Sequence, residues 1–219
     1  MIGEEQTYSS LRNFGLGVKT GIELPGEEKG VLRNINSWSK ISHSMVSMGQ
    51  ELSVTNLQLS MIYAAIANGG YLLRPQILRN ITNKNKILYE SHPEVIRKVI
   101  SNNTASKIIS ILEGVVESGS GSKAQINGYK IAGKTGTSET FENGIKSITN
   151  YISSFAGIFP SNQPKYVCVI SIDSPSVYGS HWGGVSAAPT VRNIFRRIIT
   201  ESTTISPFKP KVFIEDAKI

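Results

Sequence analysis

The chain is poor in cysteine, with Cys168 the only one among 219 residues. A single cysteine excludes a disulfide framework within the chain, and cysteine usage therefore does not fix the compartment. Cys168 lies in an apolar run, where a free thiol acts as a small hydrophobic side chain. Long apolar runs are absent too, since none reaches the roughly 18 residues of a transmembrane helix. We expect neither a signal peptide nor a membrane anchor within these residues.

Clustered charge is also lacking. The formal net charge is +7, but the Lys and Arg residues are scattered and not interleaved with aromatic side chains. Nucleic-acid binding therefore has no support, whereas a positive field suits an anionic polymer such as a cell wall. The histidines, His43, His92 and His181, lack the spacing of metal ligands. We predict no metal and no cofactor. With 39% hydrophobic and 18% charged residues, the composition is that of a globular protein.

One stretch, residues 128–138, carries the most chemical information. Its first eight residues, Gly-Tyr-Lys-Ile-Ala-Gly-Lys-Thr, fit the phosphate-loop pattern G-x-x-x-x-G-K-[ST]. An apolar run that ends in Asp173 could then hold magnesium. The context argues against a nucleotide site, because a phosphate loop follows a buried strand and opens a helix. Here residues 118–127 form a Gly/Ser-rich connection, and residues 136–144 have no helical period.

The alternative interpretation of this stretch is a strand over residues 129–137 that borders an active site. Alternation then places Lys134 and Gly136 on one face. Lys134 offers a positive charge to an anionic group, and Gly136 lets a substrate approach the backbone. Exposed backbone N–H groups can pair with a substrate or hold an oxyanion. Lys134-Thr-Gly136 resembles the Lys-Thr-Gly element of penicillin-recognising serine enzymes. A surface lysine in a turn is the remaining alternative.

The first half of the chain predicts mostly helices. Thr55 and Gln58 form a capping-box pair, and the helix that they begin is apolar all round, which predicts burial on all sides. Residues 15–30 are a glycine-rich loop, and residues 38–48 have no clean period. Residues 72–81 are predicted to be extended, with a turn at 83–86 and a short returning strand at 87–89. The predicted helices are residues 8–14, 55–68, 93–100 (with Pro93 in the first turn) and 103 or 104 to 117.

In the second half of the chain the apolar residues recur at every second position, which is typical of strands. Turn residues at Asn143-Gly144 and 160–164 separate the predicted strands, and such short connections indicate an antiparallel meander. A helix with one apolar stripe follows at Val185–Ile199, and residues 201–219 form a polar, loosely ordered tail. Helices followed by a meander and a covering helix define an α+β fold, with residues 1–200 in one domain. The predicted strands are residues 129–137, 149–159 and 165–173.

Several stretches together resemble one family. In their order along residues 8–200, they match the C-terminal part of the transpeptidase domain of class B penicillin-binding proteins, and the septal, division-specific type more than the elongation type. The resemblance therefore implies a partial penicillin-binding-protein/β-lactamase-like fold. The matching stretches are Phe14-Gly-Leu-Gly17, Met48-Gly-Gln50, Val54-Thr-Asn-Leu-Gln-Leu59, Tyr63-Ala-Ala-Ile-Ala-Asn-Gly-Gly70, Ala132-Gly-Lys-Thr-Gly-Thr137, Ser154-Phe-Ala-Gly157 and Trp182-Gly-Gly-Val-Ser-Ala-Ala-Pro189.

The resemblance also predicts what these residues do not include. The family places its S-x-x-K nucleophile and its S-x-N loop before the Phe-Gly-Leu-Gly stretch, where this sequence has too few residues. We therefore expect a chain that begins part-way into the domain, without the catalytic Ser and Lys, and that is inactive alone. Two other stretches match by pattern only. Ser37-Trp-Ser-Lys40 lies after the landmark that it should precede, and Ser101-Asn-Asn103 is better explained as a helix cap.

The family's reaction is acyl transfer from a D-Ala-D-Ala stem peptide through an acyl-serine intermediate that β-lactams imitate. By resemblance, Lys134, Thr135, Gly136 and Thr137 bind the substrate, with the Thr137 N–H at the oxyanion. Implied partners are stem peptides and β-lactams, and, through the absent N-terminal region, the membrane and division proteins. The implied location is the periplasmic or extracytoplasmic face of the inner membrane. A non-catalytic ligand-binding or regulatory module is the alternative function.

Overall fold

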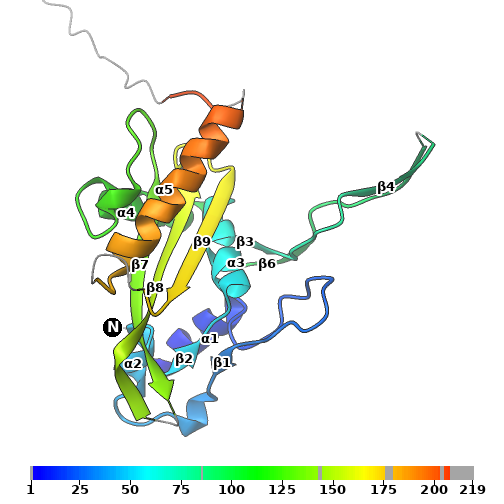
Figure 1. Cartoon of the computed structure of the whole chain (residues 1–219). Coiled ribbons are helices and arrows are strands. Elements are labelled where there is room, and N and C mark those ends of the chain that lie inside the picture. Colours follow the sequence, from blue (N-terminus) through cyan, green and yellow to red (C-terminus); the bar gives the residue numbers. More distant parts are fainter. Residues whose placement is uncertain (1, 85, 143–144, 176–179, 203–204, 208–219) are drawn as a thin grey trace, which may run out of the picture.

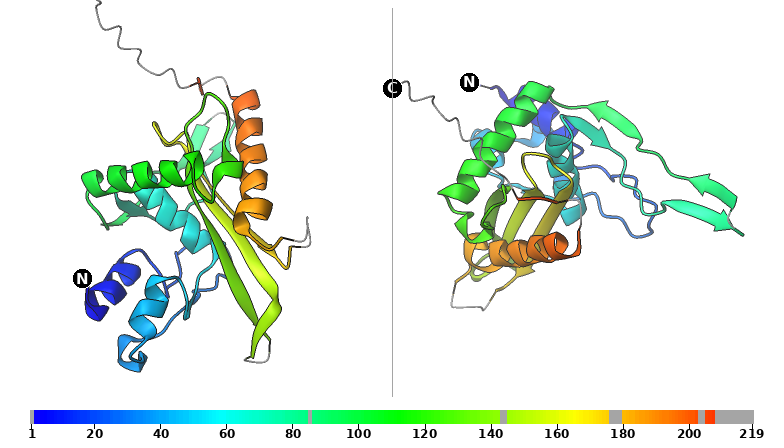
Figure 2. Two further views of the ribbon diagram at one scale, coloured as in Figure 1. Left: turned by 90° about the vertical axis from the view of Figure 1, so that its left-hand side faces the viewer. Right: turned by 90° about the horizontal axis from the view of Figure 1, so that it is seen from above.

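The computed structural model describes residues 2–207 except 85, 143–144, 176–179 and 203–204. Its centre is an antiparallel sheet in the order β7-β8-β9, formed by β7 (Ala132–Glu142), β8 (Ile145–Phe159) and β9 (Tyr166–Asp173). The helix α5 (Gly183–Glu201) lies along one face of this sheet (Figures 1 and 2). The α+β fold, the three-stranded meander and the covering C-terminal helix are therefore confirmed.

Alternation along the strands sends apolar side chains into two separate cores. On one face, Phe155 and Phe159 of β8 pack against Val191 and Phe195 of α5, and all four are fully buried. The two phenylalanine rings Phe159 and Phe195 stack with centroids 4.9 Å apart. On the other face, Ala132 and Ile158 pack against Ile66 and Leu112, which belong to the helices α3 (Asn56–Ala67) and α4 (Asn102–Glu117). The sheet is therefore covered by helices on both faces.

The helix α3 begins as the sequence predicts. The Thr55 side chain accepts a hydrogen bond from the Gln58 N–H at 3.1 Å, and the Gln58 side chain accepts one from the Thr55 N–H at 3.0 Å. The prediction that α3 is buried on all sides is wrong. Only Gln58, Met61, Ala65 and Ile66 are buried, and the other residues of the helix keep part of their surface exposed.

Gln58 also holds the loop of residues 15–30 against α3. Its amide nitrogen lies 2.8 Å from the Lys29 carbonyl, 2.9 Å from that of Val18 and 3.3 Å from that of Gly15. The side chain is only 1% exposed, so water does not replace these acceptors. A single buried amide therefore connects the helix to a loop that has no regular hydrogen-bonding pattern of its own.

The N-terminal part has more helix than predicted. The first helix, α1, spans Glu4–Asn13, and a second, α2, spans Ser42–Ser47, where the sequence shows no clean period. Six residues are too short for a period to be recognised. The two helices contact each other through Thr7 and His43, whose side chains lie 3.0 Å apart. The remaining elements are the 3₁₀ helix η1 (Ile35–Ser37) and the paired strands β1 (Val31–Leu32) and β2 (Leu52–Ser53).

A long hairpin arm projects from the body between α3 and α4 (Figure 1). The predicted helix at residues 93–100 is wrong, because the strand β6 (Val95–Lys98) pairs antiparallel with β3 (Tyr71–Leu73), and the Val99 N–H donates to the Gly70 carbonyl. The β-branched Val95, Ile96 and Val99 favour this extended backbone over the helix signal of Pro93. The predicted turn and returning strand are confirmed, although Asn85 is outside the described residues. The arm consists of β3 (Tyr71–Leu73), β4 (Asn80–Asn83), β5 (Lys86–Glu90) and β6 (Val95–Lys98).

The remaining predictions concern connections and ends. The Ser101 side chain caps α4 by accepting from the Thr104 N–H at 3.0 Å, and the 3₁₀ helix η2 (Ser122–Ala124) follows α4. The predicted turn at Asn143-Gly144 lies outside the described residues, as do residues 203–204 and 208–219 of the predicted tail. In that tail Ile205 is 8% exposed and packs on the α5 core. In the described part of the chain no helix is long and apolar enough to cross a membrane.

The lone cysteine has the environment that its sequence context predicts. Cys168 lies in β9, is partly buried, and packs beside the core that contains Phe155 and Phe195. Burial raises the pKa of its thiol above the ordinary value, because the low-dielectric surroundings disfavour the thiolate. The thiolate is the reactive form, so this position favours a structural over a chemical role.

Replacing Gln58 by Leu is expected to lower the free energy of unfolding by about 1–3 kcal/mol, because it leaves buried polar groups unpaired. Urea unfolding followed by circular dichroism measures the change. The matched control is Gln76→Leu, since the exposed Gln76 makes one hydrogen bond, to the His92 carbonyl, and we expect a change within about 0.5 kcal/mol. Equal effects of the two substitutions would contradict the role given to Gln58.

Candidate functional site

The motif of residues 128–135 lies in a strand and not in a phosphate loop. Ile126 and Tyr129 form an isolated bridge, β7 begins at Ala132, and the strand continues through Lys134 and Thr135 to Glu142. No helix opens after Thr135, so the nucleotide interpretation is wrong. In the described sheet β7 is an edge strand, since it pairs with β8 alone. Its outer edge can therefore accept an extended ligand by strand pairing.

Lys134 and Gly136 share one face of β7, as alternation predicts. In the register, Lys134 lies opposite Ala156, and Gly136 lies opposite Ser154. The Lys134 side chain is exposed, and its ammonium donates to the Thr135 carbonyl at 3.0 Å. It forms no ion pair with any carboxylate in the part of the chain that the structure describes. Its charge is therefore available to an anionic ligand.

Thr135 and Thr137 lie on the opposite face, and their hydroxyls already have partners. The Thr135 hydroxyl lies 2.9 Å from that of Ser120, and the Thr137 hydroxyl accepts a hydrogen bond from the Gly183 N–H at 3.1 Å. A hydroxyl has one donor and two acceptor positions, so the Thr137 O–H is still available to donate. Ser120 and Gly183 were not predicted as site residues, because each lies far from the motif along the chain.

Glycines allow α5 to begin directly against the sheet. A Cβ at Gly183 would collide with the carbonyl oxygens of Ser154 and Gly136, and a Cβ at Gly184 would collide with that of Ser120. Gly136 is crowded in turn by the Ser154 hydroxyl. The absence of a side chain at Gly136 thus serves the packing of β7 on β8, in addition to the substrate access that the sequence suggests.

Aromatic side chains lie beside the first turn of α5. Trp182 is the N-cap residue of α5 and is 61% exposed. The His181 ring stacks on Tyr151 with centroids 4.0 Å apart and lies 4.9 Å from the Trp182 ring. The Ser153 hydroxyl donates to the His181 carbonyl, which fixes the backbone before α5. The row of rings therefore borders the same end of the sheet as Thr137.

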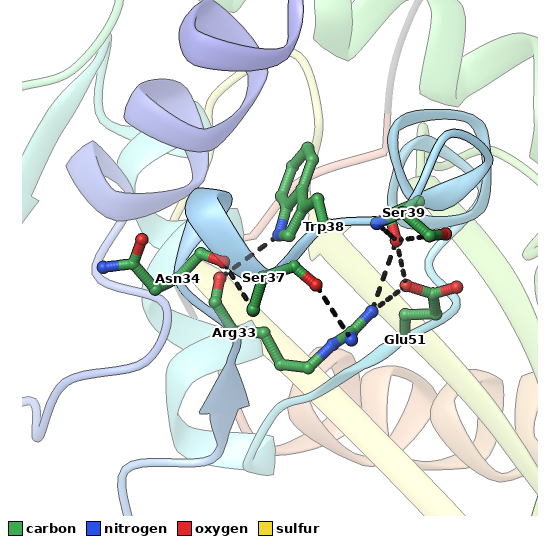
Figure 3. A network of polar contacts seen from close by, with 7 residues as sticks. Arg33, Asn34, Ser37, Trp38, Ser39 and Glu51 are labelled. Atoms are coloured by element: carbon green, nitrogen blue, oxygen red, sulfur yellow. Dashed lines mark hydrogen bonds and ion pairs between the residues drawn. The ribbon is translucent and has the colours of Figure 1, made fainter.

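The two misleading serine motifs have structural roles. Ser37 ends η1, and its hydroxyl donates to the Asn34 carbonyl at 2.7 Å (Figure 3). Figure 3 also shows Arg33 between the Ser37 carbonyl and Glu51. No contact joins the hydroxyl of Ser37 to the ammonium of Lys40 among the described interactions. Ser101 is the N-cap of α4, as the sequence predicts.

Three further titratable side chains, Tyr63, His43 and His181, have defined surroundings in the structure. Burial raises the pKa of Tyr63, on α3, to about 12, because ionisation would place a charge against the apolar core. The side chains of His43 and His181 contact Thr7 and Tyr151 respectively. Among the residues described, no group of three His, Cys, Asp or Glu side chains could hold a metal ion. The exposed Lys134 ammonium and the outer edge of β7 are suited to binding an anionic, extended ligand.

The family follows from comparison with known proteins. The family model of the penicillin binding protein transpeptidase domain matches residues 1–196, and the chain belongs to this family. It is 38% identical to the penicillin-binding protein PbpB of Mycolicibacterium smegmatis over 203 residues, which is 88% of this chain and 31% of that protein. It is 34% identical to the stage V sporulation protein D of Bacillus subtilis over 203 residues, again 31% of that protein's length and 91% of this chain.

Solved structures give the same answer for the fold. Penicillin-binding protein 3 of Mycobacterium tuberculosis, in complex with ampicillin, superimposes with a TM-score of 0.86 at 34% identity, over 96% of this chain and 48% of that one. The transpeptidase domain of penicillin-binding protein 3 from Burkholderia pseudomallei superimposes with a TM-score of 0.82 at 30% identity, over 95% of this chain and 60% of that one. The chain thus spans about a third of its curated relatives and about half of these structures.

Replacing Gly183 by Ala is expected to lower the free energy of unfolding by about 1–3 kcal/mol, because the new methyl meets two fixed carbonyl oxygens. Gly114→Ala is the matched control. Gly114 lies inside α4, where an added methyl group would meet open space, and alanine there is expected to stabilise by about 0.5–1 kcal/mol. Urea denaturation of both variants measures these changes. If both substitutions changed the free energy of unfolding in the same direction, the close packing of α5 on the backbone of β7 and β8 would be contradicted.

Proposed function

We propose that residues 1–200 form part of the transpeptidase domain of a peptidoglycan D,D-transpeptidase, and that β7 is one wall of its substrate cleft. The observation that supports this most is the unpaired edge of β7 with Lys134 on one side and Thr137 on the other. A stem peptide that ends in D-Ala-D-Ala is extended and carries a terminal carboxylate. Strand pairing along β7 accommodates such a backbone, and the Lys134 ammonium compensates its charge.

Each residue of the motif then has a separate role toward the peptide. The ammonium of Lys134 attracts the terminal carboxylate. The O–H of Thr137 donates to the same group while its oxygen stays bound to the Gly183 N–H, so the hydroxyl is held in one orientation. Thr135, paired with Ser120, offers a second hydroxyl from the same face. Gly136 lets the peptide lie against the backbone, and the Thr137 N–H donates to the developing oxyanion.

We further propose that no serine within residues 1–219 is the nucleophile of acyl transfer. The supporting observations are the hydrogen bond of Ser37 to Asn34 and the capping role of Ser101. Acyl transfer by the parent protein requires a nucleophile and a base from its S-x-x-K element, placed opposite β7. For the parent we propose a role in septal cell-wall synthesis on the extracytoplasmic face of the membrane, with β-lactams as inhibitors and division proteins as partners.

Replacing Lys134 by Ala is expected to weaken binding of an N-acetylated D-Ala-D-Ala peptide about tenfold, because a charge-assisted hydrogen bond is lost. Titration of the purified chain by isothermal calorimetry or NMR measures the affinity. The matched control is Lys107→Ala, since Lys107 is an exposed lysine of α4 and not part of β7, and the affinity of this variant is expected to equal that of the unmodified chain. An equal loss in both variants would mean that net charge, and not the site, governs binding.

Incubation of the chain with a fluorescent penicillin, followed by denaturing electrophoresis, is expected to show no covalent label. The Ser37 hydroxyl donates to the Asn34 carbonyl, and the Ser101 hydroxyl accepts from the Thr104 N–H and lies 2.8 Å from the Thr104 hydroxyl. Among the described interactions neither serine contacts a base. A stable label that mass spectrometry locates on Ser37, Ser101 or any other serine of the chain would contradict the absence of a nucleophile. Unlabelled protein that still binds the D-Ala-D-Ala peptide reversibly would support the proposed cleft wall.

A further inference from the structure

A polar depression lies away from Lys134 and Thr137, between the C-terminal half of α5 and the loop that connects η2 to β7. This loop runs beside α5 in both side views (Figures 1 and 2). The depression has a volume of about 300 Å³ and is lined by Gln125, Ile126, Asn127, Arg192 and Arg196. At a rise of about 1.5 Å per residue, Arg192 lies about 14 Å along the α5 axis from Gly183. The depression is thus separate from the candidate substrate site.

The lining carries two positive charges and no negative one. Arg192 and Arg196 are four residues apart on α5, and side chains at that spacing are neighbours on a helix surface. Neither forms an ion pair with a carboxylate in the described part of the chain. Arg197, by contrast, donates to Glu201 at 2.8 Å. Two like charges at this spacing repel each other, so an anion between them would be stabilising.

Arg192 has a feature that a solvent-exposed arginine lacks. Its Nε is buried and has no hydrogen-bond partner among the residues that the structure describes. A buried donor without an acceptor is uncommon, because its hydrogen bonds to water are lost and no protein acceptor replaces them. An oxyanion in the depression would supply the missing acceptor.

The wall opposite the arginines is held in place. The Gln125 amide donates to the carbonyls of Val116 and Glu117, both at 2.8 Å, and so ties the loop to the end of α4. The Tyr129 N–H donates to the Ile126 carbonyl, which closes a tight turn over Asn127 and Gly128. The loop is therefore arranged before any ligand arrives, which reduces the entropy that binding costs.

We propose that this depression binds a phosphate group, held by the guanidinium groups of Arg192 and Arg196. Guanidinium forks match the oxygen geometry of phosphate and of carboxylate. Phosphate is favoured because its charge of up to two balances two arginines, whereas a carboxylate balances one. The Nε–H of Arg192 donates to one oxygen, and Arg196, which is exposed, closes the open side.

NMR of the ¹⁵N-labelled chain tests the proposal, because the Nε–Hε signal of each arginine reports on its own hydrogen bonds. Inorganic phosphate is titrated at constant ionic strength, with sodium acetate as the carboxylate comparison. We expect saturable shifts of the Arg192 and Arg196 signals with phosphate, at least fivefold weaker with acetate. Dimethyl phosphate distinguishes between kinds of phosphate group. Shifts of the arginine signals with dimethyl phosphate would assign the site to phosphodiesters, and no such shifts would assign it to free phosphate or monoesters.

Variants decide whether the two arginines form the site. Arg196→Gln is expected to weaken phosphate binding about tenfold without disturbing the fold, because the side chain is exposed. Arg192→Lys, which keeps the charge but removes Nε, is expected to weaken it by a similar factor. The matched control Arg197→Gln, one residue along α5, is expected to leave the affinity unchanged. No saturable shift with phosphate, equal shifts with acetate, or an equal loss in Arg197→Gln would overturn the proposal.

Discussion

The first turn of α5 packs closely on the backbone of β7 and β8. Gly183 makes this possible, since a methyl group there would collide with the carbonyls of Gly136 and Ser154. The Gly183 N–H then reaches the Thr137 hydroxyl at 3.1 Å. This contact joins the first turn of α5 to the Lys-Thr-Gly strand, so the covering helix and the candidate site share one contact. It also fixes the orientation of a hydroxyl that the sequence alone leaves undetermined.

Strict alternation along β7 and β8 explains how one strand serves both a core and a cleft. Odd-numbered residues such as Phe155 and Phe159 pack under α5, while Ala132 and Ile158 pack under α3 and α4. Directly after Ala132 the apolar residues of β7 give way to Lys134, Thr135 and Thr137, and the outer edge of this strand has no partner among the described strands. The two cores hold β7 in place, so its polar end can be rigid without being buried.

Features with a strong local signal were predicted from the sequence. The capping box of Thr55 and Gln58, the cap at Ser101, the meander and the apolar stripe of α5 are all present, because each depends on residues close together in the chain. The helix predicted at residues 93–100 failed because pairing of β6 with β3 overrides the signal of Pro93. The partners of Thr135 and Thr137 could not be predicted, since Ser120 and Gly183 reach them only through the tertiary fold.

A crystal structure of the chain soaked with an N-acetylated D-Ala-D-Ala peptide is the most direct test of the central claim. The account predicts a peptide paired along the outer edge of β7, with its terminal carboxylate about 3 Å from the Lys134 ammonium or the Thr137 hydroxyl. The hydrogen bond from the Gly183 N–H to Thr137 should remain in place. A peptide bound elsewhere, with the β7 edge empty, would contradict the account.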